Sequence, residues 1–187
     1  MKRKAENEPR QKTEQERKTG MYTVIQAAID VLIVFIHILL MKLYPAHAHL
    51  FEKTATALLL CGASVYDIRT AGIPITTIAG MISINIIYPL VCSWEANVLF
   101  ISGLPVLVLF IIYFINRNVI GPGDILLLGA AMPALTPVEI FGFLFLCFSF
   151  SSVVGIIMGI KRKKIKGTII PLAPCIALAF FIRALIL

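Results

Sequence analysis

The sequence predicts an all-α polytopic membrane protein, a bundle of about seven transmembrane helices. Mean hydropathy is +0.92, 59% of the residues are hydrophobic and only 14% are charged. A water-soluble domain of 187 residues with this composition would expose large apolar patches and aggregate. Apolar runs of roughly 20 residues recur along the chain, which is the length a helix needs to cross about 30 Å of hydrocarbon.

Turn-forming residues divide the apolar part of the chain into segments that we expect to be helical. There are seven of them: Met21–Met41, Ala48–Tyr66, Ile73–Cys92, Ala96–Ile115, Ile125–Leu135, Val138–Ile160 and Thr168–Leu187. The fifth is too short to cross the hydrocarbon, because 11 residues of helix rise only about 16 Å. Its start should therefore lie below the membrane surface, in a wet cavity lined by protein.

Residues 1–20 differ from the rest in being polar and mixed in charge. We expect them to form a disordered cytoplasmic tail, since they hold too few apolar side chains to build a core. The apolar run that follows is too long for a cleaved signal peptide. Residues 21–187 show no internal repeat and are predicted to be one membrane-embedded domain.

The distribution of Lys and Arg predicts the orientation of the helices. If the tail is cytoplasmic and the segments alternate, 14 of the 17 Lys and Arg residues face the cytoplasm, and the C-terminus is external. The cluster Lys161–Lys166 then fixes topology and contacts anionic lipid head groups. A pI near 9.4 needs no nucleic-acid partner to explain it.

Three carboxylates fall within or beside the apolar segments: Asp30, Asp67 and Asp124. Ionisable groups at membrane depth are costly, so each is a candidate for function. The predicted topology brings Asp67 and Asp124 to the cytoplasmic side, although 57 residues separate them. Two carboxyls held close together share a proton, so one can activate a water molecule while the other donates to a carbonyl oxygen.

Asp124 follows Gly121-Pro122-Gly123. Glycine permits backbone conformations and close approaches that a Cβ would block, so an extended peptide could lie against this stretch. At Gly123 we expect either a backbone conformation that other residues disfavour or a tight approach to a substrate. The alternative interpretation is a simple turn in which Asp124 caps the following helix.

Three motifs resemble those of type IV prepilin peptidases, which belong to the GxGD group of intramembrane aspartic proteases. Asp67-Ile68-Arg69-Thr70-Ala71-Gly72-Ile73-Pro74 matches the family pattern D-x-R-x-x-x-I-P, and Gly121-Pro122-Gly123-Asp124 matches G-x-G-D. Ile170-Pro171-Leu172-Ala173-Pro174 matches a late I-P-x-x-P stretch. The resemblance covers about Ala48 to Leu187, so Met21–Met41 is an extra helix ahead of a six-helix peptidase core.

The resemblance implies an aspartic endopeptidase of a prokaryotic plasma membrane with Asp67 and Asp124 as its catalytic pair. The implied substrate is a pilin-like precursor, cut at the cytoplasmic face between a short basic leader and an apolar helix. Arg69 either orients the pair, binds substrate or only marks the cytoplasmic side. Supporting roles fall to Pro74, Gly121, Gly123, Pro171 and Pro174, the last two by breaking the final helix near the site.

Two features depart from the family. Leu126 stands where relatives often carry Lys, and the chain lacks the cysteine-containing domain of bifunctional members, so methyl transfer is not implied. Neither the four cysteines nor His47 and His49 have the spacing of metal ligands, and no metal or other cofactor is predicted.

Two other functions stay open. Tyr66-Asp67, the G-x-G-D motif and Pro133-Ala134-Leu135 superficially fit the presenilin and signal-peptide-peptidase group, although that group places its Pro-Ala-Leu on a later helix. Asp30 and His37, seven residues apart, could instead serve a non-enzymatic membrane transporter as a proton relay, or make a buried structural contact. Transport would depend on Asp30, whereas proteolysis would depend on Asp67 and Asp124.

Overall fold

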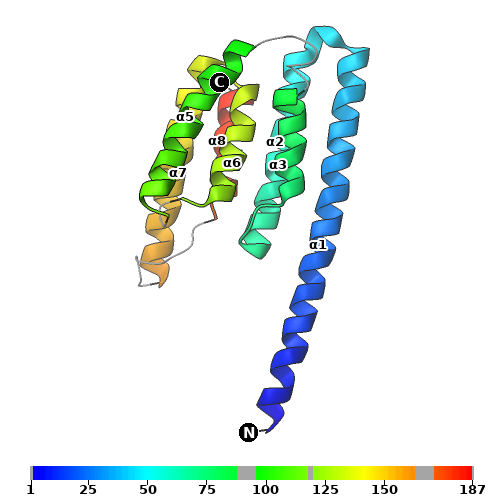
Figure 1. Cartoon of the computed structure of the whole chain (residues 1–187), viewed down its shortest axis with the longest axis vertical. Helices are drawn as coiled ribbons and strands as arrows, with labels where there is room; N and C mark the ends of the chain where they lie inside the picture. Colours follow the sequence, from blue (N-terminus) through cyan, green and yellow to red (C-terminus); the bar gives the residue numbers. More distant parts are fainter. Residues whose placement is uncertain (1, 88–95, 118–119, 163–170, 187) are drawn as a thin grey trace.

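The computed structural model describes residues 2–87, 96–117, 120–162 and 171–186, and all regular structure in these ranges is helical (Figure 1). The α-helices are α1 (Lys2–Leu43), α2 (Ala48–Thr70), α3 (Ile75–Ile82), α5 (Ala96–Ile115), α6 (Pro122–Ala131), α7 (Pro137–Arg162) and α8 (Ala173–Phe181). Short 3-10 turns at Pro45–His47 and Met132–Ala134, and π-helical turns at Ser83–Ile87 and Ile182–Ile186, continue or join them. The all-α prediction is confirmed.

Each of the seven apolar segments overlaps one of these helices. The ends of two expected segments, residues 88–92 and 168–170, lie outside the described residues, as does most of the basic cluster, 163–166. The fifth segment is short, as expected: α6 has ten residues, and the 3-10 turn after it begins at a Met-Pro pair.

The prediction of a disordered tail is wrong, because α1 begins at Lys2 and continues without a break through the first apolar segment. Lys, Arg, Glu, Gln and Ala dominate residues 2–18, and all of them have high helix propensity. Helix nucleation is the costly step, and the apolar helix that follows supplies the nucleus from which the polar part extends. The 42 residues of α1 rise about 63 Å.

Successive helices run in opposite directions, with α3, α6 and α8 antiparallel to α2, α5 and α7 (Figure 1). The end of α2 and the starts of α6 and α8 consequently lie at one end of the bundle, the end toward which the N-terminus points (Figure 1). The turn after α6 and the C-terminus lie at the other end. The three motifs of the sequence therefore meet at one end.

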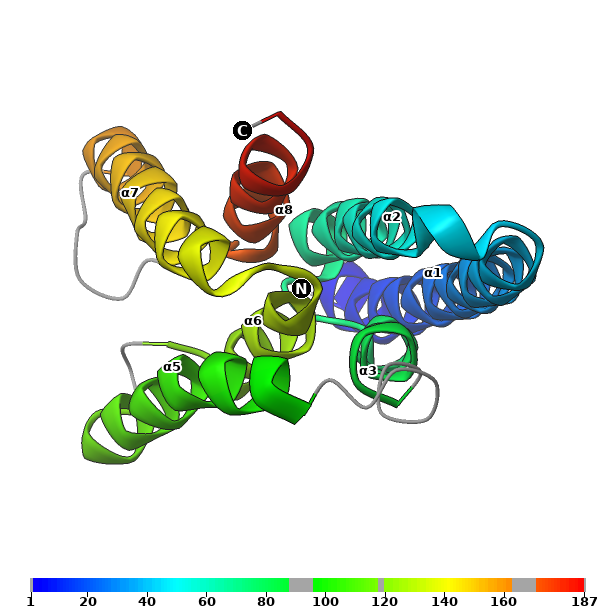
Figure 2. The ribbon, with the colours of Figure 1, turned by 90° about the horizontal axis from the view of Figure 1, so that it is seen from above.

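The packed centre of the bundle is formed by α2, α6 and α8, with α3 beside them (Figure 2). Leu59 and Leu60 of α2, Leu127 of α6, and Ile176 and Phe180 of α8 are fully buried. Seen from above, α5 and α7 diverge from this centre, and α1 lies outside it against α2 and α3 (Figure 2).

Two helices in the described ranges are long and apolar enough to cross a membrane, Thr19–Leu43 in α1 and Pro137–Lys161 in α7. Only 22% and 17% of their most apolar stretches are buried inside the bundle. The core helix of a soluble protein buries most of its apolar surface, whereas these two expose side chains such as Phe35, Phe141 and Phe145. Their exposed apolar surface is what a lipid-facing helix presents.

Candidate active site

Asp67 lies in the last turn of α2 with only 7% of its surface exposed. Its Oδ2 atom accepts a hydrogen bond from the backbone amide of Ala173, the first residue of α8, at 3.4 Å. One turn earlier, the Ser64 hydroxyl donates to the Leu60 carbonyl of its own helix at 2.7 Å and, in a shared bond, to the Ala173 carbonyl at 3.1 Å. The end of α2 is thus tied to the start of α8, where unpaired amides and the helix dipole favour a carboxylate.

The chain leaves α2 through a left-handed residue. Ala71 has φ 52° and ψ 43°, and its amide donates to the Asp67 carbonyl. It is the one non-glycine residue with positive φ among those described. Glycine usually occupies such a position, since a Cβ there costs energy, and Gly72 stands one residue later. This tight exit turns the chain back toward α3, whose N-cap is the buried Pro74.

Asp124 lies in the first turn of α6, three residues after the N-cap Gly121. Its carboxylate reaches back and accepts a hydrogen bond from the Gly121 amide, as the acidic member of a capping box does. A Cβ added to Gly121 would lie 2.9 Å from Oδ2 of Asp124. Gly121 therefore allows the carboxylate to take this position.

The structure brings Asp67 and Asp124 close enough for the charge of one carboxylate to act on the other. They approach from opposite helix directions, Asp67 at the end of α2 and Asp124 at the beginning of α6. Carboxyls at short range resist ionising together, and a proton shared between them relieves the repulsion.

Gly123 differs from what the sequence led us to expect. Its φ lies outside the positive range that favours glycine, and an added Cβ would meet the Ile73 side chain at 3.6 Å, an ordinary contact. The expectation of a backbone conformation disfavoured for other residues is therefore wrong. Gly121 is instead the position where a side chain would clash, because the Asp124 carboxylate lies against it. Gly123 is where the first two motifs touch, through Ile73.

Arg69 is exposed, and its guanidinium carbon lies 5.0 Å from the centre of the Tyr22 ring on α1. The hydroxyls of Thr23 and Tyr66 form a second contact between α1 and α2 at this level, at 2.8 Å. Cation–π packing on Tyr22 thus accounts for the direction of the Arg69 side chain.

The prolines of the third motif lie at the start of α8. Pro171 precedes the helix, and Pro174 is its second residue, a position where the missing amide hydrogen costs nothing. Ile170 lies outside the described residues. Residues 171 and 172 are not helical and α8 begins at Ala173, while the part of the expected segment before Pro171 lies outside the described residues.

Sequence reasoning missed Ser64, the Ala173 amide and two cysteines. Ser64 lies three residues before Asp67, so helical spacing could have placed it on the same face. Cys147 of α7 and Cys175 of α8 are buried, and the charge of Asp124 reaches Cys147. No local pattern marks these thiols, because their proximity to the site depends on how α6, α7 and α8 pack.

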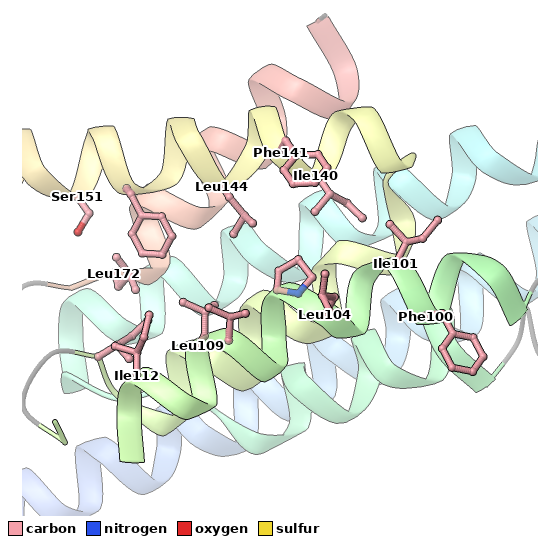
Figure 3. Close-up of a pocket in the computed structure, with 14 residues that line it drawn as sticks. Phe100, Ile101, Leu104, Leu109, Ile112, Ile140, Phe141, Leu144, Ser151 and Leu172 are labelled. Carbon is pink, nitrogen blue, oxygen red and sulfur yellow. The ribbon is translucent and has the colours of Figure 1, made fainter. Parts of the chain in front are cut away.

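An apolar groove of about 770 Å³ opens between α5 and α7 (Figure 3). Ser151 is the one polar side chain among the residues that line it. At one end, near Ile112 and Ser151, the groove is bounded by Leu172 (Figure 3). Leu172 directly precedes Ala173, which binds Asp67, and Ile120, another lining residue, directly precedes Gly121. The groove therefore ends at residues that directly precede Ala173 and Gly121, the two residues whose amides bind Asp67 and Asp124.

Asp30 has only 2% of its surface exposed and accepts hydrogen bonds from Gln26, Thr76 and Thr77, all neutral donors. His37 is also buried, but it lies about 10 Å further along α1, where it interacts with the backbone of Phe51 on α2. The two groups that a proton relay would use thus have separate surroundings.

No family model, curated protein or solved structure matches this chain. The likeness to prepilin peptidases therefore rests on the three sequence motifs.

Proposed function

We propose that this protein is an integral membrane aspartic endopeptidase of the prepilin-peptidase type, with Asp67 and Asp124 as its catalytic pair. The observation that carries the proposal is the meeting of three motifs that are far apart in the sequence. Asp67 accepts from Ala173 of the third motif, Ile73 of the first packs on Gly123 of the second, and the two carboxylates interact. If the three short patterns matched by chance, there would be no reason for the three motifs to lie together in the fold.

In the proposed reaction, the pair holds one proton and a water molecule lies between the carboxyls. The ionised carboxylate takes a proton from the water as its oxygen attacks the scissile carbonyl carbon, and the protonated carboxyl donates to the carbonyl oxygen. Collapse of the resulting tetrahedral diol breaks the C–N bond, and the leaving amine takes a proton from the pair. No cofactor is needed.

The proposed substrate is a pilin-like precursor with a short basic leader and an apolar helix. We place the site at the cytoplasmic face of a prokaryotic plasma membrane, with the N-terminus cytoplasmic and the C-terminus external, because this orientation puts most Lys and Arg inside. The groove between α5 and α7 suits the apolar helix of the precursor, since it is apolar and ends at Leu172 and Ile120, which directly precede the residues that bind Asp67 and Asp124. Cleavage just before that helix follows from this placement.

The presenilin-like alternative fits the fold less well. Pro133 and Ala134 lie in the 3-10 turn that ends α6, at the opposite end of that helix from Asp124 and on no later helix. The stretch that reaches Asp67 is instead the start of α8. The start of α8 belongs to the I-P-x-x-P stretch, which resembles that of prepilin peptidases.

The direct test is cleavage of such a precursor by the purified protein in liposomes, with the products identified by mass spectrometry. Asp67→Asn and Asp124→Asn should each abolish cleavage without changing the amount of inserted protein. Glu139→Gln is the matched control, because it makes the same carboxyl-to-amide change in the ion pair with Lys53, which joins the first turn of α7 to the second turn of α2. Substantial cleavage by either aspartate variant would rule out the pair.

A further inference from the structure

The buried carboxylate of Asp30 joins α1 to the first turn of α3. Gln26 Nε2 donates to Oδ1 at 2.9 Å, and the hydroxyls of Thr76 and Thr77 both donate to Oδ2, at 2.9 and 2.7 Å. Thr76 and Thr77 are the second and third residues of α3, so the carboxylate also lies at a helix N-terminus. Three short hydrogen bonds to one buried group fix where α3 begins relative to α1.

Gln26 is itself held by α2. A Cβ added to Gly62 would overlap the side-chain amide of Gln26, so this amide packs directly on the backbone of α2. The carboxylate of Asp30 is therefore placed from two sides, by its own helix through Gln26 and by α3 through the threonines.

The first turn of α3 continues directly into the candidate site. Pro74 is the N-cap of α3, and the side chain of Ile73 before it lies in van der Waals range, 3.6 Å, of the position that a Cβ of Gly123 would take. Asp124 is the next residue after Gly123. A displacement of Thr76 and Thr77 would thus be passed to Ile73, and from there to the first turn of α6 that holds Asp124.

We propose that Asp30 is a positioning residue of the aspartate site, which acts through Thr76, Thr77 and Ile73 to hold the first turn of α6 in place. This inference rests on the proposed function for its activity readout. It gives the extra N-terminal helix a specific task in catalysis, and it assigns Asp30 a role in which its hydrogen bonds matter and its charge does not.

A crosslinking experiment measures this geometry without any cleavage. An ideal Cβ on Gly123 lies 3.8 Å from Cβ of Ile73, which matches the separation in a disulfide. In the full-length protein with its four native cysteines changed to alanine, Ile73→Cys with Gly123→Cys should crosslink under mild oxidation. Labelling of free thiols with a maleimide polymer measures the rate of loss of both thiols.

Asp30→Leu in this background should slow crosslinking several-fold, whereas Asp30→Asn should leave the rate close to that of the parent. An asparagine oxygen can accept from both threonines, and its amide can donate to the Gln26 oxygen once that side chain rotates. Crosslinking at the parental rate in Asp30→Leu, or no crosslinking in the parent pair, would overturn the proposal.

Cleavage by otherwise wild-type protein supplies the second readout. Asp30→Leu and Thr77→Val should lower kcat by about tenfold or more with KM nearly unchanged, as misplacement of catalytic groups does. Thr56→Val is the matched control, since it removes an equally buried threonine hydrogen bond, to Asn85, from a site away from the α3 start. It should lower thermal stability as much as Thr77→Val and leave kcat unchanged.

The outcomes separate this inference from the proposed function. If the wild-type protein cleaves no precursor, the proposed function fails, and the crosslinking rates still decide whether Asp30 positions Ile73 against Gly123. If Asp30→Asn loses as much kcat as Asp30→Leu, the ionised carboxylate itself is used and the positioning role is wrong.

Discussion

The backbone amide of Ala173 donates a hydrogen bond to the Asp67 carboxylate across 106 residues of chain. This contact joins the first and third motifs and supplies a fixed donor to one oxygen of Asp67, Oδ2. The other oxygen, Oδ1, is then the atom that Asp67 would offer to a water molecule or to Asp124.

The two aspartates should fail as a unit. Asp67→Asn and Asp124→Asn should each remove cleavage, and the double variant should be no worse than either single variant, because neither carboxyl has a proton partner alone. The measurement is the single-turnover cleavage rate of all three proteins beside the wild type. Residual rates that multiply in the double variant would show that the two residues act independently.

Gly121 should tolerate alanine less well than Gly123. The new Cβ at Gly121 would lie 2.9 Å from Oδ2 of Asp124 and force that carboxylate to move, whereas the Cβ at Gly123 would make an ordinary 3.6 Å contact with Ile73. We expect Gly121→Ala to lose on the order of 10²-fold in kcat and Gly123→Ala less than about tenfold. Paired cleavage assays on the two variants decide the matter, and the reverse order would contradict it.

Ser64→Ala should destabilise the bundle by about 1 kcal/mol, because the Ser64 hydroxyl bonds to the Leu60 carbonyl of its own helix at 2.7 Å and also links α2 to the Ala173 carbonyl at 3.1 Å. Ser152→Ala is the control, since the Ser152 hydroxyl bonds within its own helix, to the Phe148 carbonyl. Thermal unfolding in detergent should show a lower midpoint for the first variant and little change for the second. Equal midpoints would mean that the link to α8 adds nothing.

Filling the groove should weaken substrate binding. Leu144 lines the groove, and its neighbour Phe145 lies on the same helix outside it and is exposed. Leu144→Trp should raise KM several-fold with kcat nearly unchanged, the behaviour expected when binding shared by ground state and transition state is lost. Phe145→Trp should change neither constant. If a lipid chain fills the groove instead of the precursor, both variants will keep the wild-type KM.

Ala71→Gly should stabilise the protein, contrary to the usual effect of glycine. At φ 52° the Cβ of alanine is strained, and its removal should gain up to about 1 kcal/mol. Ala28→Gly, in an ordinary turn of α1, should instead lose roughly 0.5–1 kcal/mol. Unfolding of the two variants under identical detergent conditions gives the comparison, and a loss of stability in Ala71→Gly would show that the left-handed turn is not strained.

The sequence predicted the helices and the end of the bundle where the motifs meet. Apolar length and turn residues define each segment, and the alternating direction of successive helices then decides which helix ends lie on the same side. It did not predict that α1 extends to Lys2, because polar composition alone does not separate disorder from a helix that is nucleated downstream.

The sequence also did not predict the contacts between segments that are far apart in the chain. Gly121 and Gly123 look equivalent in the motif. Only the direction of the Asp124 side chain shows that a Cβ would clash at Gly121 and fit at Gly123. The partners of Asp30 on α3 are more than 45 residues away, so a carboxylate that seemed available for transport is fully engaged in hydrogen bonds. Such contacts depend on helix packing, which short patterns do not encode.

The short helices carry a consequence for the bilayer around the protein. The apolar helical stretches Pro122–Ala134 and Ala173–Ala184 each rise only about 20 Å, against a hydrocarbon thickness of about 30 Å. On the proposed membrane placement, the lipid beside them must thin or the protein must sink on one side, and either response has an elastic cost that grows with the mismatch. Acyl-chain length would then tune how readily water and a substrate strand reach the carboxylates, so that membrane thickness would regulate the proposed cleavage.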